Sequence, residues 1–470
     1  MHIKEDVSSL RIGGALWSWC RPTAIAVVVA TMGMSAHADP ASDRIRALEE
    51  KLEQSLKQIS ALTERVKQLE SKGPATQNAA AQAPSGSPQT SAAAESADRR
   101  IEALEQEVSA ITNRSTQDDG LPIHGFASVG SVFTNKTGAK NGATIESVDF
   151  YLTPQLGDRV RGLFEMNTEA SQDGTVGVDL ERLQLGYVFG DELTLWAGRF
   201  HTPYGYWNTA FHHGAQIQTS ILRPRFLDFE DSGGILPAHN VGLWGHGQSS
   251  LSDTKLTYDI WLANSPHLSA NGNDPSNTSN TQDPSLKGAT NGKALMGFKV
   301  GVTPSFLGGA TVGLHAYASR VGGPDTGYYA SQTISSSKMA GGYATYLEND
   351  WEVLSEYYRF HDRNENPASP KYQSGYYSWA GYIQVGYNYS LWTPYARFEK
   401  TRLNQNDDYF AAQASGRSYT RTVAGVRYEL GSRSALKLEF NRTRQGDPDV
   451  SGDTLPGNFN ETRLQFAVRF

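Results

Sequence analysis

From Ile123 to the C-terminal Phe470, apolar and polar residues alternate along most of the chain. This period of two is typical of a β-strand with one apolar and one polar face. The last segment is the clearest, because Leu464 and Phe466 fall on one face and Arg463 and Gln465 on the other. The pattern predicts sixteen strands, which begin near residues 123, 145, 159, 178, 193, 240, 254, 294, 309, 338, 351, 376, 391, 418, 434 and 460.

The connections between these strands are short and long in turn. Short ones such as residues 190–192 and 388–390 alternate with long polar ones such as residues 264–293 and 401–417. An even number of strands with this rhythm is typical of an all-β, antiparallel transmembrane barrel. In lipid such a sheet must close, and at this strand number closure leaves a water-filled lumen. A soluble β-sandwich also alternates, but it gives no reason for the regular rhythm.

The N-terminal segment has the features of a signal peptide. Its longest apolar stretch, residues 24–34, follows Lys4, Arg11 and Arg21 and precedes a small-x-small pattern at residues 36–38. Signal peptidase cuts after such a pattern, which predicts cleavage after Ala38 and export of the chain.

Heptad spacing follows the expected signal peptide. Ile45, Leu52 and Ile59 occupy one seam position, and Leu48 and Leu62 occupy the other. This spacing predicts a coiled coil and hence an oligomer, with a lone surface helix as the alternative. The expected organisation is a signal peptide at 1–38, a coiled coil at 39–72, a flexible linker at 73–98, a second short coiled coil at 99–120 and the barrel at 121–470.

The third long connection, from His201 to His239, is rich in apolar and aromatic residues. A purely solvated loop does not need such residues, so we expect this one to fold inward against the barrel wall and narrow the lumen. The alternative is a loop outside the barrel that contacts another subunit. Folded inward, it forms a constriction with opposed charges from Arg223, Arg225, Asp228, Glu230 and Asp231.

Composition excludes several other functions. The chain has 42 Lys and Arg against 49 Asp and Glu, a net charge of −7, and no basic blocks, so we expect no nucleic-acid partner. The only cysteine, Cys20, lies in the expected signal peptide. Common hydrolase and nucleotide-binding motifs are missing, and the histidines of the third connection lack the spacing of a metal site. We expect no enzyme activity, no metal and no cofactor.

Alternation also predicts which charges face the lumen. In the last four strands five basic residues stand against three acidic ones. Because a narrow wet channel concentrates the field of its wall charges, we expect mild selectivity for small anions such as organic acids. The alternative is a nearly unselective pore. The expected pore-lining residues are Arg161, Glu165, Arg182, Arg397, Glu399, Arg427, Glu429, Lys437, Glu439, Arg463 and Arg469.

The signal peptide, the sixteen strands, the long third connection and the terminal phenylalanine together resemble a Gram-negative trimeric porin, over residues 121–470. The ending Leu464-x-Phe466-x-Val468-x-Phe470 resembles the signal read by the barrel-assembly machinery, which implies that role for Phe466 and Phe470. Residues 198–205, GRFHTPYG, are similar to strand-to-loop segments of the phosphate-selective porin group. The leading coiled coil is similar to the periplasmic extension of substrate-specific porins.

This resemblance implies a homotrimer in outer-membrane lipid, with its N-terminal region in the periplasm, that lets small hydrophilic solutes diffuse passively. Two other functions stay open. One is a structural or adhesive outer-membrane barrel that the coiled coil tethers. The other is an outer-membrane hydrolase whose site is built from residues of distant strands.

Overall fold

The computed structural model describes residues 123–170, 176–211, 214–230, 232–270, 280–284, 286–323, 332–413, 415–447, 449 and 457–470. All of them belong to the second of two compact units, Ala103–Phe470. The predicted signal peptide, both coiled-coil segments and the linker lie outside the described residues.

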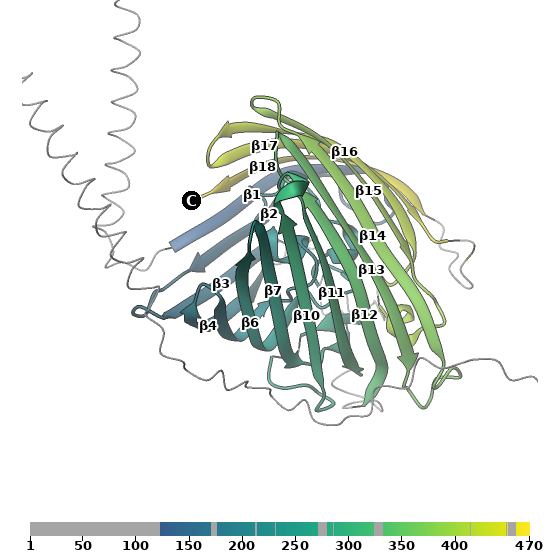
Figure 1. Ribbon diagram of the computed structural model, residues 1–470. Coiled ribbons are helices and arrows are strands. Elements are labelled where there is room, and N and C mark those ends of the chain that lie inside the picture. The colour runs from purple at the N-terminus through teal and green to yellow at the C-terminus, as the bar shows by residue number, and fades with distance from the viewer. Residues whose placement is uncertain are drawn as a thin grey trace, which may run out of the picture. The chain divides into compact units, whose positions relative to one another are not determined.

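The described residues form an antiparallel β-barrel (Figure 1). Its sheet has eighteen strands, of which sixteen close the barrel. The other two, β8 (His267–Ala270) and β9 (Asn280–Asp283), pair with each other in the connection between β7 and β10. The sixteen are β1 (Ile123–Thr134), β2 (Gly142–Leu152), β3 (Val160–Ala170), β4 (Val176–Gly190), β5 (Leu193–His201), β6 (His239–Leu251), β7 (Thr254–Asn264), β10 (Ala294–Pro304), β11 (Thr311–Gly322), β12 (Thr333–Tyr346), β13 (Trp351–Asn364), β14 (Gly375–Tyr387), β15 (Trp392–Arg402), β16 (Tyr419–Gly431), β17 (Ser434–Gln445) and β18 (Asn458–Arg469).

The predicted barrel of sixteen antiparallel strands is confirmed, and the observed strands begin close to the predicted positions. The largest difference is at β12, predicted near residue 338 and observed from Thr333. Closure comes from the antiparallel pairing of β1 with both β2 and β18, in which Ser128 lies opposite Ser147 and Ala467. Each of the sixteen barrel strands in the described part of the chain therefore has two neighbours, and the barrel has no open edge.

Short turns and long connections lie at opposite ends of the strands, and we refer to these as the short-turn end and the long-connection end. In the turn between β12 and β13, Asn349 and Asp350 have φ values of 53° and 65°. Successive positive φ values are typical of a tight hairpin turn, and Asn and Asp tolerate them well. The residue types at these two positions therefore favour the tight turn that joins β12 and β13 at the short-turn end.

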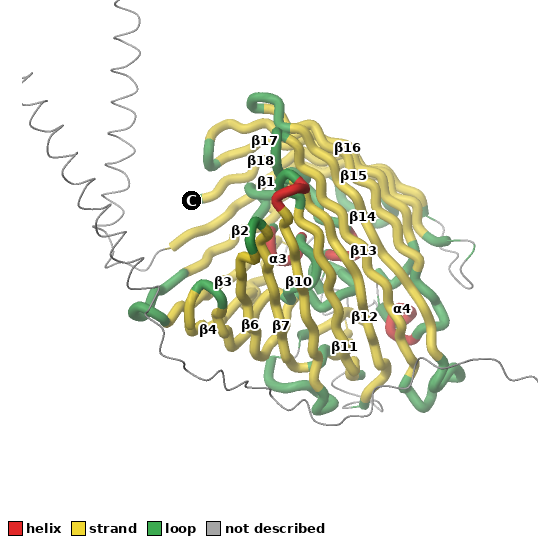
Figure 2. Tube along the Cα trace, viewed as in Figure 1, coloured by secondary structure: helices red, strands yellow, loops and turns green. Residues whose placement is uncertain are grey.

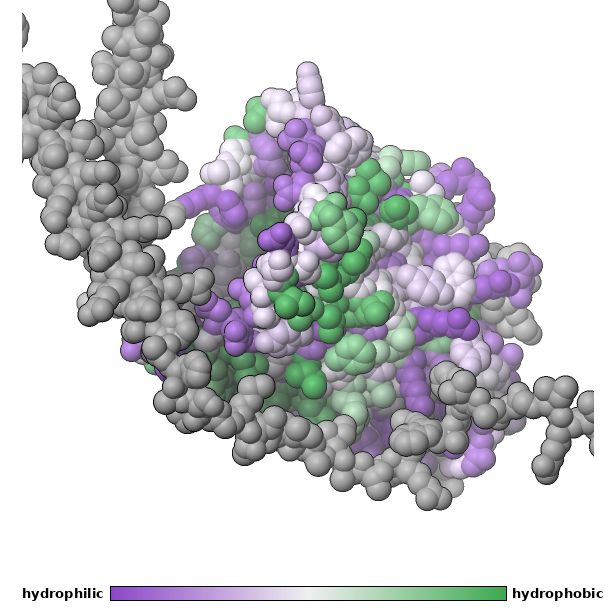
Figure 3. All heavy atoms as spheres, viewed as in Figure 1, coloured by the Kyte–Doolittle hydropathy of each residue, from purple (hydrophilic) through white to green (hydrophobic). Residues whose placement is uncertain are grey.

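The two faces of the wall differ as the alternation predicts. On β17, Leu436, Leu438 and Phe440 are exposed, whereas Lys437 and Glu439 between them are buried. On the face shown in Figure 3, hydrophobic side chains cover much of the middle of the barrel and hydrophilic ones gather toward its ends. No helix in the described part of the chain is both long and apolar enough to cross a membrane.

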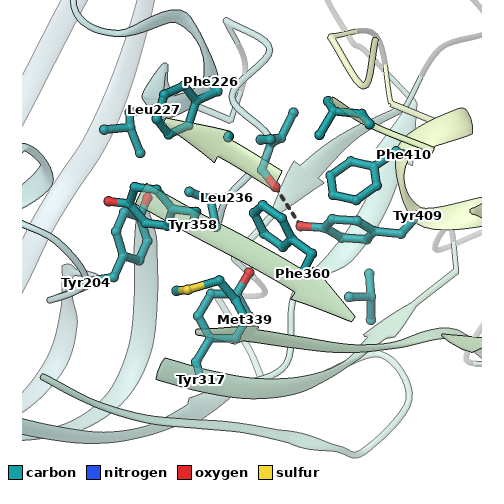
Figure 4. Packing of buried hydrophobic residues seen from close by; sticks show 14 of the residues in the cluster. Tyr204, Phe226, Leu227, Leu236, Tyr317, Met339, Tyr358, Phe360, Tyr409 and Phe410 are labelled. Carbon is teal, nitrogen blue, oxygen red and sulfur yellow. Dashed lines mark hydrogen bonds between the residues drawn. The ribbon is translucent and has the colours of Figure 1, made fainter. Parts of the chain in front are cut away.

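The main hydrophobic core lies between the third connection, residues 202–238, and the inner wall. This connection contains a short helix, α3 (Trp207–Ala210) (Figure 2), and a 3-10 turn, η1, at Arg225–Leu227. Phe226 and Leu227 of η1 pack with wall residues such as Tyr358 and Phe360 (Figure 4). A second small helix, α4 (Asp408–Ala411), joins this core through Tyr409, whose hydroxyl donates to the Ile235 carbonyl at 2.7 Å.

Candidate functional site

The third connection lies inside the barrel, and its first part is held by β11 and β13. The Gly205 backbone N–H donates to Nδ1 of His315 at 2.9 Å, and that of Trp207 donates to Oε1 of Glu356 at 2.8 Å. Gly205 has a φ of 57°, and a Cβ on it would meet the Glu356 carboxylate and the Tyr358 hydroxyl. A glycine is therefore required where the chain enters the lumen.

Its middle part is held by β16 and β17. Glu439 accepts hydrogen bonds from the backbone N–H groups of Ile221 at 2.8 Å and Leu222 at 3.4 Å. Lys437 donates to the carbonyls of Ala215 and Ser220, and Arg427 donates to those of Gln216 and Gln218. The backbone N–H and C=O groups of this buried segment have no partners in a sheet, and buried backbone groups need hydrogen bonds. Three of the predicted pore-lining residues supply them.

The last anchors come from β15. Arg397 forms an ion pair with Glu399 at 2.9 Å and donates to the Ser220 hydroxyl at 2.8 Å. Glu399 also accepts from the Arg225 backbone N–H at 2.9 Å. Arg397 and Glu399 are 2% and 0% exposed, so these two predicted lining residues lie between the wall and the third connection.

The residues of the predicted constriction lie in the segment that these anchors hold. Arg223 donates to Oδ1 of Asn208 at 3.1 Å, and its guanidinium lies 3.9 Å from the centre of the Phe229 ring. Glu230 accepts from the His239 backbone N–H at 2.7 Å and pairs with its Nδ1 at 3.0 Å. Asp231 lies outside the described residues.

Burial controls the ionisation of this segment. It lowers the pKa of Arg223, and the nearby Asp228 partly offsets the effect. It raises the pKa of Asp228, and Arg223 opposes that shift. Burial would also raise the pKa of Glu230, but the charge of His239 and its hydrogen bonds outweigh burial, so this pKa lies below its ordinary value.

The remaining predicted lining residues form ion pairs or lie near the short-turn end. Arg182 pairs with Glu165 at 2.5 Å, and Arg427 pairs with Glu429 at 2.5 Å. Arg161 donates to the carbonyls of Gly157 and Asp158 in the turn between β2 and β3. Arg469 is exposed and, with Gln216, Arg427 and Glu429, lines a cavity of about 560 Å³.

Three residues near the predicted lining charges were missed by the sequence reasoning. Arg421 is in phase with Arg427 along β16, and Glu461 is in phase with Arg463 along β18, so the same alternation could have found both. Glu461 pairs with Arg463 at 2.7 Å. Lys136, in the connection between β1 and β2, had no such periodic signal.

Two of these missed residues, Lys136 and Arg421, complete a cluster of cations, which we call the lumen cluster: Lys136, Arg225, Arg421 and Arg463. Burial and the charges of Arg225, Arg421 and Arg463 lower the pKa of Lys136, whereas Glu461 opposes the shift. Arg421 is 6% exposed, and its Nε has no hydrogen-bond partner among the described residues. Three carboxylates, those of Asp228, Glu399 and Glu461, also lie near these four cations, and Glu399 is paired with Arg397 as well.

The inner wall thus has two different halves. On β11 to β14 aromatic and apolar residues such as Tyr317, Met339, Tyr358 and Phe360 pack against the third connection, beside polar residues such as Glu356. On β16 to β18 and on β3 and β4 it carries more charged residues, among them Arg427, Lys437 and Glu165. Within the described ranges, no group of three or more His, Asp or Glu side chains is arranged to hold a metal ion.

Comparison with solved structures finds similar folds at low sequence identity. An anion-selective porin from Comamonas acidovorans is 10% identical, with 75% of this chain and 99% of that chain covered and a TM-score of 0.49. The outer membrane channel DcaP of Acinetobacter baumannii is 11% identical, with 74% and 97% covered and a TM-score of 0.48. Salmonella typhi OmpF, in complex with daunomycin, is 14% identical, with the same coverage and a TM-score of 0.48. No model of a known protein family and no curated protein matches the chain.

Proposed function

We propose that this chain is an outer-membrane porin through which small hydrophilic solutes diffuse passively. The observation that carries the proposal is the distribution of side chains on a closed sheet. Exposed apolar residues such as Leu438 and Phe440 alternate with buried polar residues such as Glu439 and Asn441. A barrel of this kind meets hydrocarbon outside and water inside without an unpaired edge.

The third connection sets the size limit for solutes in this proposal. Arg223, Arg225, Asp228 and Glu230, together with Asp231, supply opposed charges at the narrow part of the lumen. Its anchoring by Glu356, Glu399 and Glu439 supports a fixed constriction rather than a mobile flap.

The pore prefers small anions, such as organic acids, in this proposal. The lumen cluster supports the preference, because its four cations outnumber the nearby carboxylates Asp228, Glu399 and Glu461, and Arg421 forms no ion pair among the described residues. The field of such a cluster is strongest where the passage is narrow and water is scarce.

Assembly and location complete the proposal. A signal peptide exports the chain, the N-terminal helices lie in the periplasm, and three copies form a homotrimer in outer-membrane lipid. The barrel-assembly machinery reads Phe466 and Phe470, which are both exposed on the outside of the barrel. The protein is not an enzyme in this proposal.

Conductance in planar bilayers tests this function. We expect the purified protein to give stepwise currents. Under a KCl gradient, we expect the reversal potential to have the sign that results when chloride is more permeant than potassium. The absence of steps in correctly folded protein overturns the porin proposal, and a reversal potential set by potassium overturns the anion preference alone.

A structural barrel is the second candidate, and the size of the core inside the lumen favours it. Trp207, Phe226, Leu227 and Phe410 are almost completely buried within the barrel. If this core closes the lumen, folded protein in a bilayer gives no current, whereas a porin conducts.

A further inference from the structure

Three tryptophans lie next to one another on the inner wall, on the neighbouring strands β5, β6 and β7. Trp196 lies directly opposite Trp244, and Trp244 lies directly opposite Trp261. Residues that face each other across an antiparallel pair project from the same face of the sheet. The preceding residues Leu195 and Leu243 are exposed on the outside, so the three indoles point inward. We call Trp196, Trp244 and Trp261 the tryptophan row.

The indole rings at the two ends of the tryptophan row lie over glycines of the next strands. Gly186 is opposite Trp196, and Gly297 is opposite Trp261. A Cβ on Gly186 would lie 2.5 Å from the Trp196 ring, and a Cβ on Gly297 would lie 2.2 Å from the Trp261 ring. Rings in the space above a glycine lie along the wall rather than across the lumen. The row therefore makes this part of the wall flat and aromatic.

The tryptophan row is buried at one end and open at the other. Trp261 is 2% exposed, whereas Trp244 and Trp196 are partly exposed. The Trp196 and Trp244 ring centres are 6.3 Å apart and the rings are inclined by 23°, an offset arrangement that leaves part of each face uncovered. Trp196 does not belong to the main hydrophobic core, so packing of that core does not account for it. Aromatic surface that faces the lumen indicates a binding site.

A row of polar side chains lies beside the tryptophans, two residues nearer the short-turn end: Thr194, His246, Asp259 and Lys299. Oδ1 of the buried Asp259 accepts from Nε1 of Trp244 at 2.9 Å and lies 2.8 Å from Nδ1 of His246. Its Oδ2 pairs with Lys299 at 3.1 Å. Asp259 thus fixes the orientation of the Trp244 indole. The side chain of His246 is 47% exposed and faces the lumen.

The two rows together fit a ring-shaped ligand that has an apolar face and a polar edge. Positions two residues apart along a strand are about 7 Å apart, which is close to the width of one sugar ring. The C–H groups on one face of a pyranose pack on an indole, and the hydroxyls at its edge bind polar side chains. Asp259 and Lys299 neutralise each other, so this part of the wall offers an ion no net charge. The chemistry therefore favours a neutral ligand.

We infer that Trp196 and Trp244 form a binding site for a neutral pyranose sugar in the lumen, with Thr194 and His246 as hydrogen-bonding partners. Phe200 of the main core stacks on Trp244, with ring centres 5.6 Å apart. The site therefore borders the core that the third connection forms with the wall. This inference rests on the proposed water-filled lumen and goes beyond the anion preference, because it assigns a class of solute that charge does not select.

Sugar binding by the purified full-length protein tests the inference. The probe is cellobiose, and the control is sorbitol at twice the molar concentration, which supplies the same amount of carbon without a ring. We expect calorimetry in detergent to show cellobiose binding that is at least about tenfold tighter than sorbitol binding. Equal binding of the two solutes, or no binding of cellobiose, overturns the inference.

Variants separate this site from a general effect of removing an indole. Trp196→Ala should weaken cellobiose binding about tenfold, the typical effect of losing one stacking ring, and Trp196→Phe should keep much of the affinity because a ring remains. His246→Ala removes an exposed side chain and should weaken binding several-fold. Trp392→Ala removes an exposed indole from the outer surface and should bind like wild type. Unchanged binding by the Trp196→Ala and His246→Ala variants, or an equal loss in Trp392→Ala, overturns the site.

Conductance of the same preparations distinguishes this inference from the proposed function. Stepwise currents without cellobiose binding contradict the sugar site alone. Cellobiose binding without any current contradicts the porin proposal alone. Heat-modifiable migration on gels shows that each variant has folded.

Discussion

At the scale of single residues, inward carboxylates support the backbone of the third connection. Glu356, Glu399 and Glu439 lie on three different strands, and each accepts a hydrogen bond from a backbone N–H of that connection. A charged acceptor makes a stronger hydrogen bond than a neutral one. These carboxylates therefore position the segment that narrows the lumen.

Replacing Glu439 tests this role. Glu439→Ala leaves the N–H of Ile221 and the hydroxyl of Tyr395 without their acceptor, at a cost of about 1–3 kcal/mol for each buried unsatisfied group. We expect a looser third connection, seen as noisier single-channel currents and faster cleavage by trypsin. Glu439→Gln keeps an acceptor oxygen and should lie close to wild type. Identical behaviour of the alanine variant and wild type would contradict the anchoring role.

Arg421 gives a residue-scale test of the anion preference. Arg421→Gln removes a cation whose Nε lacks a partner within the described ranges, so that atom loses no hydrogen bond, and glutamine keeps part of the buried side chain. We expect the reversal potential in a KCl gradient to move toward zero or toward potassium. Arg433→Gln, in the turn between β16 and β17, makes the same change in charge outside the lumen cluster. An equal effect of both variants would rule out a local role for Arg421.

Glu230 gives a pH dependence with a defined sign. Because its pKa in the folded state lies below its ordinary value of 4.5, its contribution to stability is present above about pH 4.5 and is lost as the pH falls through the lowered pKa. We expect the unfolding temperature on heat-modifiability gels to fall below pH 4.5. Glu230→Gln should flatten that dependence, and an unchanged profile would contradict the assignment.

At the scale of elements, the third connection is an internal layer rather than an exposed loop. Phe226 packs edge-on against Tyr358, with ring centres 5.5 Å apart, and Tyr409 bonds to Ile235 from the connection between β15 and β16. Two connections from distant parts of the chain therefore stabilise each other inside the barrel.

Phe226→Ala tests whether the layer and the wall are separable. Removing a buried phenylalanine costs about 3–5 kcal/mol where the surroundings cannot collapse, and here the cost should fall on the third connection. We expect a folded barrel with larger conductance. Phe440→Ala, on the outer surface, should leave conductance unchanged. An unfolded barrel in the Phe226 variant would show that layer and wall are not separable.

At the scale of the whole molecule, closure depends on the two ends of the barrel sequence. Gly125 N–H donates to the Phe470 carbonyl at 2.9 Å, and the Phe470 N–H donates to the Gly125 carbonyl at 3.0 Å. A Cβ on Gly125 would lie 2.4 Å from the Phe470 ring and 2.5 Å from the Asp149 carbonyl oxygen. The terminal phenylalanine thus contacts the first strand where a side chain would not fit.

Glycine substitutions test closure. Gly125→Val should prevent β1 from pairing normally, because the new side chain overlaps with the backbone of β2 as well as with Phe470. We expect loss of the heat-modifiable folded band after refolding. Gly177→Val, on β4, meets no atom within 4 Å of its Cβ and should refold. Normal refolding of the Gly125 variant would contradict this view of closure.

The sequence by itself determined the strands, their faces and the two kinds of connection. The reason is local: alternation has a period of two, and in a closed sheet it separates an outer apolar face from an inner polar one. It therefore also identified the inward charges of β15 to β18, and the aromatic content of residues 201–239 indicated a loop that packs against the wall.

Only the tertiary structure decided what each inward charge does. Glu439 and Ile221 are 218 positions apart, and Arg397 and Ser220 are 177 positions apart, so no local pattern reports their contacts. Alternation predicts that a side chain points inward, but it does not predict whether that side chain contacts water or another part of the chain. The third connection meets the side chains of Arg397, Glu399 and Glu439, whereas Arg421 has no ion-pair partner among the described residues. Packing between segments that are distant in the sequence decides which inward charges are covered.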